Sequence, residues 1–272
     1  MNPPPTSYGP VSTPWASSNP LTDALPLVHF GGPGERCETQ PGILRVVTWN
    51  IELGERIDQA IAALTTTPGL ADADVLLLQE MGSEGTAQIA EALGFDWAYA
   101  SGGPHSKTGR EFGNAVLSRW AIERADVTPL PHQALIMGEF RFGLRASINL
   151  AGTTLDAWSV HAEISTLPFR RQVAQYEAIA RATGDSEADM KIVGGDFNTA
   201  TTRNVRMLMH RMAAVGATFT SVEVGDTFER FGRAFKLDHL FNVGMDPESA
   251  GTPGRLDASD HAPVWARFMT FN

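Results

Sequence analysis

From Ile43 onward, short apolar runs alternate with amphipathic segments, and this alternation is the strongest constraint on the fold. ILRVVTWNI alternates and is rich in β-branched residues, whereas DVLLLQE is a continuous apolar run typical of a strand buried on both faces. Residues 55–66, 169–184 and 202–214 repeat apolar residues at helical spacing. Strands and helices spread through both halves predict an α/β chain with two packed sheets covered by helices.

The first 42 residues differ in composition from the rest of the 272-residue chain. They are rich in Pro, Ser, Thr and Gly, and we predict that residues 1–42 form an irregular N-terminal extension. Some apolar residues within it, such as Val28 and Phe30, leave open that part of it packs on the domain. A single catalytic domain is then expected over residues 43–272.

Charge and cysteine content narrow the function classes. The formal net charge is 21 − 31 = −10, which argues against an electrostatic nucleic-acid binder without excluding a local basic cleft. The single cysteine, Cys37, rules out an intrachain disulfide and a multi-cysteine zinc site. The sequence has no secretory signal pattern and no apolar run of membrane-spanning length. We therefore expect a cytoplasmic protein with no transmembrane segment, and no protein partner is evident.

Polar side chains follow most of the predicted strands, where ligand sites of α/β sheets gather. If these strand ends meet, carboxylates, imidazoles and amides form one cluster. Carboxylate oxygens suit a hard cation, Mg²⁺ or Mn²⁺, and like charges at such proximity would destabilise one another without one. The residues concerned are Asn50, Glu52, Gln79, Glu80, His161, Asp196, Asn198, Asp238, His239, Asp260 and His261.

Seven motifs follow one another along the chain: TWNIE, LLLQE, GNAVLSR, SVHAE, GGDFN, KLDHLF and SDHAPV. This ordered set resembles the endonuclease/exonuclease/phosphatase family, which includes DNase I, AP endonucleases, neutral sphingomyelinases and inositol-polyphosphate 5-phosphatases. The resemblance runs from about Leu44 to Phe268. It implies a DNase I-like, four-layer α/β sandwich of two mixed sheets and divalent-metal-dependent hydrolysis of phosphoesters.

The resemblance also implies roles for the metal-site residues. Glu80 resembles the principal metal ligand, and Asp260 resembles another metal-site carboxylate. Glu52 lies where some members have an acidic ligand, although it could instead serve the N-terminus of the following helix. Asn50 resembles the asparagine that contacts the phosphate or the metal.

The same resemblance implies the catalytic set. Asp196 resembles the residue that orients or deprotonates the attacking water, and Asn198 resembles its phosphate-binding partner. His261 resembles the phosphate-contacting or acid/base histidine, with Asp238 as the carboxylate that orients it. His161 resembles the general acid of several members.

Two further residues are candidates for substrate binding, each with a structural alternative. Asn114 in GNAVLSR either reaches the site or satisfies backbone groups. Arg145 in GLRASINL either reaches a substrate phosphate or pairs with an acid on the sheet. The loop of residues 101–114, with His105, Lys107 and Arg110, is the expected substrate-facing segment.

We therefore predict a metal-dependent phosphoester hydrolase, preferably of phosphodiesterase type, in which activated water attacks phosphorus in line. The alternatives are a DNA or RNA endonuclease and a catalytically silent binding domain on the same scaffold. The zinc-hydrolase spacing HExxH is absent. The sequence leaves open whether the phosphoester substrate is a small molecule, a lipid headgroup or a nucleic acid.

Overall fold

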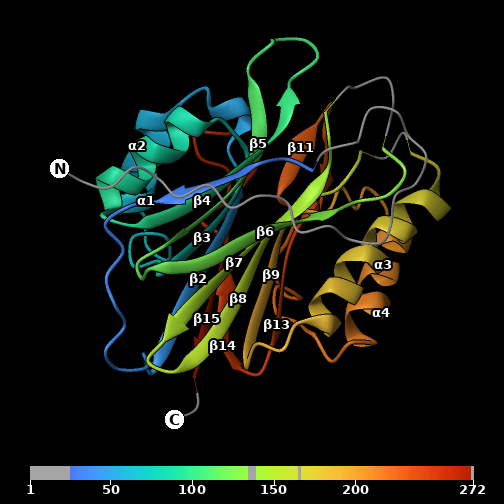
Figure 1. Ribbon diagram of the computed structural model, residues 1–272. Helices are drawn as coiled ribbons and strands as arrows, with labels where there is room; N and C mark the ends of the chain where they lie inside the picture. The colour runs from blue at the N-terminus through green and yellow to red at the C-terminus, as the bar shows by residue number, and fades with distance from the viewer. Residues whose placement is uncertain (1–24, 134–138, 165–166, 271–272) are drawn as a thin grey trace.

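Two β-sheets pack face to face, with helices covering the outer face of each sheet (Figure 1). This computed structural model describes residues 25–133, 139–164 and 167–270. The helices α1 (Ile57–Thr66) and α2 (Ser83–Leu93) cover the first sheet, and α3 (Phe169–Asp185) and α4 (Thr202–Ala213) cover the second. The arrangement is a four-layer α/β sandwich, which confirms the expected fold class.

The first sheet is mixed, with β2 and β3 parallel and its other neighbours antiparallel. Within the described residues its spatial order is β1 (Val28–Gly31), β4 (Asp96–Pro104), β5 (Glu111–Ser118), β3 (Val75–Met81), β2 (Ile43–Asn50), β15 (Val264–Met269) and β14 (Asp246–Gly251). A short 3-10 turn, η1 (Glu52–Gly54), joins β2 to α1.

The second sheet is also mixed, with β8 and β9 parallel. Its described strands lie in the order β10 (Thr218–Phe219), β13 (Asp238–Val243), β9 (Met190–Asp196), β8 (Thr153–His161), β7 (Phe142–Leu150) and β6 (Ile122–Pro129). A separate hairpin consists of β11 (Phe228–Arg230) and β12 (Arg233–Phe235).

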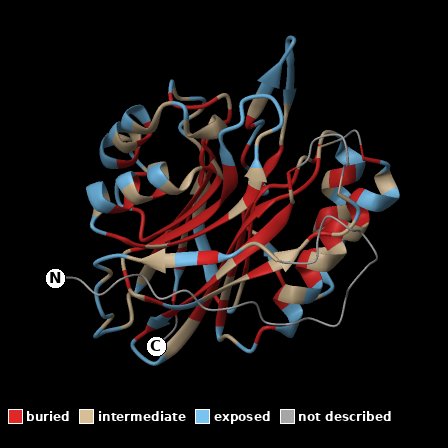
Figure 2. Cartoon of the chain, turned by 45° about the horizontal axis from the view of Figure 1, so that its top comes forward, coloured by how far each residue is buried: buried red, intermediate tan, exposed pale blue. Residues whose placement is uncertain are grey.

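The apolar run in β3 shows why the chain forms layers. Val75 and Leu77 belong to the core between the two sheets, whereas Leu76 and Leu78 belong to the core under α1 and α2. Successive side chains of a strand point to opposite faces, so a strand covered on both sides must be apolar at every position. Figure 2 shows the result as an almost continuously buried centre of both sheets.

Local signals set the ends of the helices. Gly94 ends α2 in a left-handed conformation with a φ of 69°, the C-cap that its sequence position predicts. Thr201 begins α4, and its side chain accepts a hydrogen bond from the Asn204 N–H at 3.2 Å. Val173 and Tyr176 of α3 are buried as the helical spacing predicts, and they fix the side of α3 that faces the second sheet.

The predicted irregular extension requires one correction. Val28–Gly31 forms the edge strand β1, which pairs antiparallel with β4. Four residues with one buried apolar side chain are too short to give a periodic pattern, so β1 was not predictable from sequence. Residues 32–42 are irregular apart from isolated bridges at Glu35 and Cys37, and residues 1–24 of the predicted extension lie outside the described residues. No helix in the described ranges is long and apolar enough to cross a membrane.

Candidate active site

The carboxyl ends of the two parallel strand pairs bring the candidate residues together. Asn50 ends β2 and Glu80 lies near the end of β3, in the first sheet. His161 ends β8 and Asp196 ends β9, directly opposite one another in the second sheet. Parallel neighbours end at the same edge of a sheet, so the packing of the two sheets creates one site from four strand ends.

Asn50 joins the two sheets. Its Nδ2 donates to Glu80 Oε1 at 3.0 Å and lies 3.3 Å from Asp196 Oδ2. The side chain is 1% exposed, and its Oδ1 accepts the Glu52 N–H at 3.1 Å. Asn50 therefore holds two carboxylates, one from each sheet, on a single amide group.

Glu80 leaves the regular strand geometry. The register between β3 and β5 shifts between Gln79 and Met81, and Glu80 adopts a left-handed φ of 57°. A bulge re-aims a side chain, and left-handed backbone in a residue other than glycine is uncommon outside functional sites. The Leu53 N–H donates to Glu80 Oε2 at 3.2 Å, so η1 fixes the second carboxylate oxygen.

The two glycines of the GGDFN motif allow close packing behind Asp196. A Cβ atom on Gly194 would lie 2.7 Å from Leu77 Cδ1 and 2.6 Å from Leu240 Cδ2. A Cβ atom on Gly195, whose φ is 151°, would lie 1.9 Å from Val160 O. The backbone of Val160 leaves room only for glycine at 195, whereas a side chain at 194 would have to displace the ends of two leucine side chains. This close packing brings the Asp196 carboxylate to the site.

A carboxylate–imidazole pair forms the second part of the cluster. His261 Nδ1 lies 2.9 Å from Asp238 Oδ2, which also accepts the Thr227 hydroxyl at 2.6 Å. Burial disfavours the charged ring and lowers the pKa of His261. The nearby carboxylates, above all Asp238 and then Asp196 and Asp260, outweigh burial and raise this pKa to about 10. His261 is therefore cationic at neutral pH, with its Nε2 3.8 Å from Asp196 Oδ2.

His161 has the opposite electrostatic character. Burial, and after it the positive charges of Arg141 and His261, lower the pKa of His161 well below its usual value. Its Nε2 lies 3.5 Å from Asp196 Oδ2 and 4.0 Å from Glu80 Oε1, and its Nδ1 is buried without a hydrogen-bond partner. The two imidazoles beside Asp196 therefore differ in charge.

Asp196 and Asp260 are also perturbed. Burial raises the pKa of Asp196, and the negative charges of Asp238 and Glu80 raise it further, against the opposing effects of His261 and the Asn198 N–H. Burial likewise raises the pKa of Asp260, with Glu80 contributing in the same direction. Carboxylates whose negative charge is this unfavourable are stabilised by a bound cation.

The donor set fits a hard divalent cation. One polar atom each from Asp196, Asp238 and His261 lies within 4.8 Å of the others, and all three residues are buried. The cationic His261 ring is a donor only, so the two carboxylates supply the ligand atoms. Asp238 Oδ2 pairs with His261, whereas Asp238 Oδ1 is buried without a hydrogen-bond partner and is free to bind a cation. The Glu80 carboxylate lies beside this cluster, where it accepts a hydrogen bond from Asn50. Carboxylate oxygens are the ligands that Mg²⁺ and Mn²⁺ prefer.

Three sequence candidates have other partners. The Glu52 carboxylate pairs with Arg56 rather than with the cluster. The Asn114 amide donates to Phe142 O at 2.9 Å and Ser159 O at 3.1 Å, which is the backbone-satisfying alternative. Arg145 pairs with Asp126 and Asp156.

The substrate-contacting alternative for Arg145 is therefore corrected. Its guanidinium also lies 5.8 Å from the ring centroid of Trp158, which belongs to the core under α3 and α4. The sequence pattern placed Arg145 on a strand but not on a face, and the face decides its partner.

The amide of Asn198 donates to Ala162 O at 2.9 Å, and its backbone N–H donates to Asp196 Oδ1 at 2.9 Å. Asn198 thus orients Asp196.

Arg141, which no sequence motif predicted as a site residue, lies beside His161. It is 4% exposed, and its guanidinium lies 4.7 Å from the ring centroid of Phe112, which also contacts His161. Its Nε lies 3.9 Å from Glu163 Oε1, and its Nη1 is buried without a hydrogen-bond partner. An arginine within the aromatic stretch EFRF is the one sequence signal for a buried cation there.

Two packed mixed sheets flanked by helices are the architecture of DNase I-like proteins. The sequence matches the Endonuclease/Exonuclease/phosphatase family over residues 47–261. That match spans most of the chain, so the chain belongs to this family. Its cluster of candidate residues lies where the two sheets meet.

The chain is similar in sequence to one group of proteins and similar in fold to several solved structures. A UPF0294 protein from Vibrio cholerae serotype O1 is 26% identical, over 91% of this chain and 85% of the relative. A humanized TDP2 from D. rerio has a TM-score of 0.66 and 17% identity, over 85% of this chain and all of that one. A mannosyl-6-phosphatase from Bacteroides thetaiotaomicron has a TM-score of 0.64 and 16% identity, over 83% and 99%. The two structural likenesses show the shared fold.

Proposed function

We propose that this chain is a divalent-metal-dependent phosphoester hydrolase, preferentially of phosphodiesters. The single observation that carries the proposal is the position of the Asp196 carboxylate. It lies within 4 Å of Asn50 Nδ2, His161 Nε2 and His261 Nε2, in a buried cluster made by both sheets. Family membership and the names of the structural neighbours support the same reaction class.

Asp196 is the proposed base that orients the attacking water and accepts its proton. Burial raises its pKa, which makes the carboxylate a better proton acceptor near neutral pH than an ordinary aspartate. The Asn198 N–H holds Oδ1 at 2.9 Å, so Oδ2 faces the cluster. A fixed carboxylate of this kind selects one direction of attack on phosphorus.

His261 and Asn50 are the proposed phosphate-binding groups. The cationic His261 ring, held at Nδ1 by Asp238, presents Nε2–H to a phosphoryl oxygen. The Asn50 amide directs one hydrogen at Glu80 Oε1 and the other at Asp196 Oδ2, so it is proposed to donate to a phosphoryl oxygen in place of the longer contact with Asp196. His161, which is held neutral, is proposed to donate a hydrogen bond from Nε2 toward the leaving oxygen.

Glu80, Asp196, Asp238 and Asp260 are the proposed source of cation ligands. A bound Mg²⁺ or Mn²⁺ would neutralise charge on the phosphoryl oxygens and lower the pKa of a coordinated water. Asn50 would hold the Glu80 and Asp196 carboxylates at a fixed separation for this purpose.

Hydrolysis of bis-p-nitrophenyl phosphate with Mg²⁺ or Mn²⁺ tests the proposal. Wild-type protein is expected to turn over the diester only with metal, and Asp196→Asn is expected to reduce kcat by about 10²–10⁴-fold. Arg145→Gln is a control outside the cluster and should keep its turnover. Equal rates for wild type and Asp196→Asn, or turnover unaffected by a chelator, would refute the proposal.

A further inference from the structure

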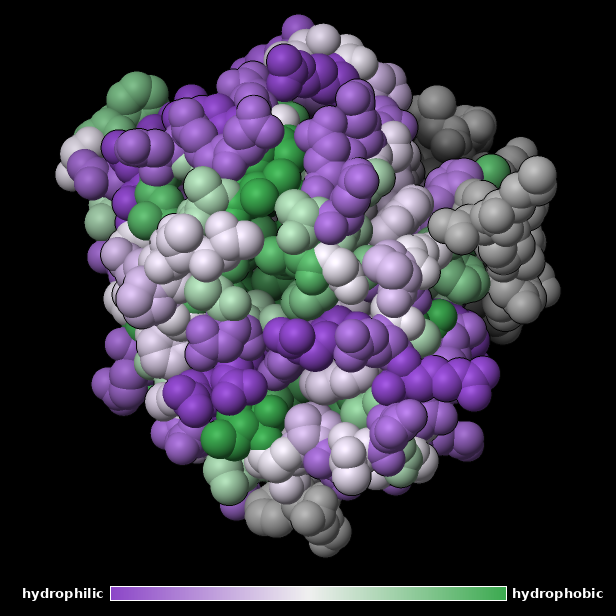
Figure 3. Space-filling model, turned by 90° about the vertical axis from the view of Figure 1, so that its left-hand side faces the viewer, coloured by the Kyte–Doolittle hydropathy of each residue, from purple (hydrophilic) through white to green (hydrophobic). Residues whose placement is uncertain are grey.

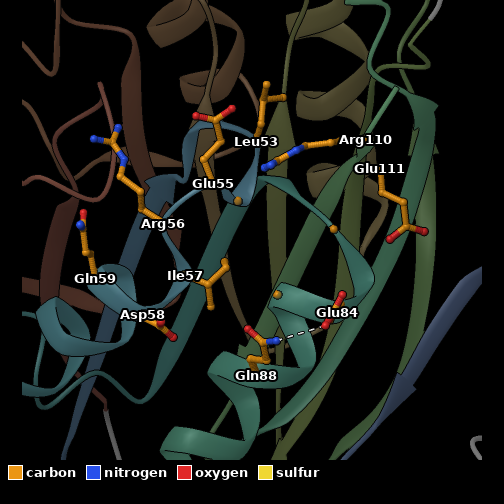
Figure 4. Close-up of a pocket in the computed structure, with 13 residues that line it drawn as sticks. Leu53, Glu55, Arg56, Ile57, Asp58, Gln59, Glu84, Gln88, Arg110 and Glu111 are labelled. Atoms are coloured by element: carbon orange, nitrogen blue, oxygen red, sulfur yellow. Dashed lines mark hydrogen bonds between the residues drawn. The ribbon is translucent and has the colours of Figure 1, made fainter. Parts of the chain in front are cut away.

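A cavity of about 710 Å³ opens between η1, the first turns of α1 and α2, and the start of β5 (Figure 4). None of the seven sequence motifs contributes to its lining, but Arg110 and Glu111 belong to the loop of residues 101–114 that the sequence predicts to face the substrate. Three glycines, Gly54, Gly82 and Gly85, line the cavity and leave it without side chains at those positions. On this face, hydrophilic side chains surround smaller apolar patches (Figure 3). Its volume is in the range that holds a small organic group.

The cavity lies directly beside the candidate catalytic cluster. Leu53 lines the cavity, and its backbone N–H donates to Glu80 Oε2 at 3.2 Å. Gly82 lines it two residues after Glu80, and Arg56 lines it while pairing with Glu52. A group esterified to a phosphate at the cluster therefore needs to extend only past η1 to enter the cavity.

Most of the side chains that line the cavity are polar, and they are mixed in charge. Carboxylates come from Glu55, Asp58, Glu84 and Glu111, guanidiniums from Arg56 and Arg110, and amides from Gln59 and Gln88. Only Leu53 and Ile57 have large apolar side chains, and the described lining residues include no aromatic side chain. Figure 4 shows Glu84 and Gln88 hydrogen-bonded to each other along one wall, with Arg110 across from them.

This lining discriminates between classes of ligand. An acyl chain finds little apolar surface, and a nucleobase or a quaternary ammonium group finds no aromatic ring to stack on. A second phosphate would face four carboxylates against two guanidiniums. A hydroxyl group both donates to a carboxylate and accepts from a guanidinium or an amide, so a hydroxyl-rich group satisfies both kinds of side chain.

We infer that the cavity binds the uncharged, hydroxyl-rich arm of a phosphoester, such as a sugar or another polyol, while the phosphorus lies at the Asp196 cluster. This inference rests on the proposed hydrolase function and specifies its substrate class. The cavity then determines which phosphoester is hydrolysed fastest, whereas the cluster carries out the reaction.

Three p-nitrophenyl phosphodiesters with one leaving group test the inference. Their second arms are a hexose, a methyl group and an aminoethyl group. Wild type is expected to have about tenfold higher kcat/KM for the hexose diester than for the methyl diester, as a few hydrogen bonds would give. Gln88→Trp, which fills the cavity from an exposed helix position, should lower the hexose value to the methyl value. It should leave turnover of the methyl diester unchanged.

Variants that remove one carboxylate charge test whether the cavity binds the hexose arm of the diester. Glu84→Gln should raise KM for the hexose diester severalfold, and Glu91→Gln, a matched exposed glutamate on α2 outside the cavity lining, should not. Equal kcat/KM for the hexose and methyl arms would overturn the inference and leave the hydrolase function intact. A preference for the aminoethyl arm would overturn it in favour of a cation subsite.

A binding measurement separates the cavity from the chemistry. Saturation-transfer NMR with a methyl hexopyranoside needs no turnover. The wild type and Glu91→Gln should both show transfer, and Gln88→Trp should lose it. Absence of transfer in wild type would overturn the inference even if hydrolysis is found, and transfer with no hydrolysis of any diester would refute the hydrolase function alone.

Discussion

The Asn50 amide lies 3.3 Å from Asp196 Oδ2, and this contact joins the end of β2 in one sheet to the end of β9 in the other. The same amide donates to Glu80 Oε1. Two carboxylates that would otherwise repel one another therefore share a neutral donor. The geometry of the site depends on how the two sheets pack as much as on either sheet alone.

Asn50 and Asn114 form a matched pair for mutation. Asn50→Ala should lower kcat/KM by about 10²–10³-fold, because it removes a donor from the proposed phosphate site. Asn114→Ala should instead destabilise the fold by ~1–3 kcal/mol, because it leaves buried carbonyls of Phe142 and Ser159 unpaired. Urea unfolding and diester hydrolysis measured on both variants distinguish the two effects. A stable but inactive Asn114→Ala would contradict the assignment.

Asp238→Asn should remove the charge that keeps His261 cationic. The pKa of His261 should fall, because burial then dominates, and kcat should fall by about 10²–10⁴-fold. Histidine NMR titration reports the pKa, and hydrolysis assays report kcat. Thr227→Val removes the hydroxyl that donates to Asp238 and accepts the Leu237 and Asp238 N–H groups, but it leaves the Asp238 charge in place. It should therefore have a smaller effect on both quantities. An unchanged His261 pKa in Asp238→Asn would show that the pair is not coupled.

Mg²⁺ should stabilise the wild-type protein against thermal unfolding. At a concentration about 100 times Kd, binding adds ~2.7 kcal/mol to the free energy of unfolding. Glu80→Gln should abolish most of this Mg²⁺-dependent rise in Tm. Glu52→Gln should retain it, because the Glu52 carboxylate pairs with Arg56. Loss of the Mg²⁺ effect in Glu52→Gln would return Glu52 to the metal site.

His239 should make the fold sensitive to acid. It is fully buried beside Thr199, and burial followed by Lys236 lowers its pKa to about 3, from 6.5. The unfolded chain binds this proton below about pH 6.5 while the folded chain does not. Stability is therefore complete above that pH and is lost as pH falls toward 3, by up to about 1.4 kcal/mol per pH unit.

Urea unfolding at pH 7 and pH 5 tests this dependence. The wild type should lose more stability between the two pH values than His239→Gln, whose side chain does not titrate. The remaining carboxylates and histidines are common to both proteins, so the difference isolates His239. Equal losses would show that the buried ring does not drive acid unfolding.

The sequence by itself determined the class of fold and most members of the cluster. The apolar run of β3 and the helical spacing of α3 are local patterns, and a side chain's periodic position follows directly from them. Ordered motifs that resemble those of the family identified Glu80, Asp196, Asp238 and His261 as candidates. Glu80 and Asp196 lie at the ends of parallel strands, which meet at one edge of a sheet. Asp238 instead begins the antiparallel strand β13, and His261 precedes β15.

Only the tertiary structure decided which partner each polar side chain meets. Arg145 pairs with Asp126, and Glu52 pairs with Arg56. Arg141 lies at the site although no motif predicted it. These outcomes depend on the face of a strand, on a bulge or a turn, and on how two sheets approach. The contacts of Arg145 and Arg141 join separate strands, and a local sequence pattern does not contain them. Glu52 and Arg56 are only four residues apart, and the turn η1 between them decides that they meet.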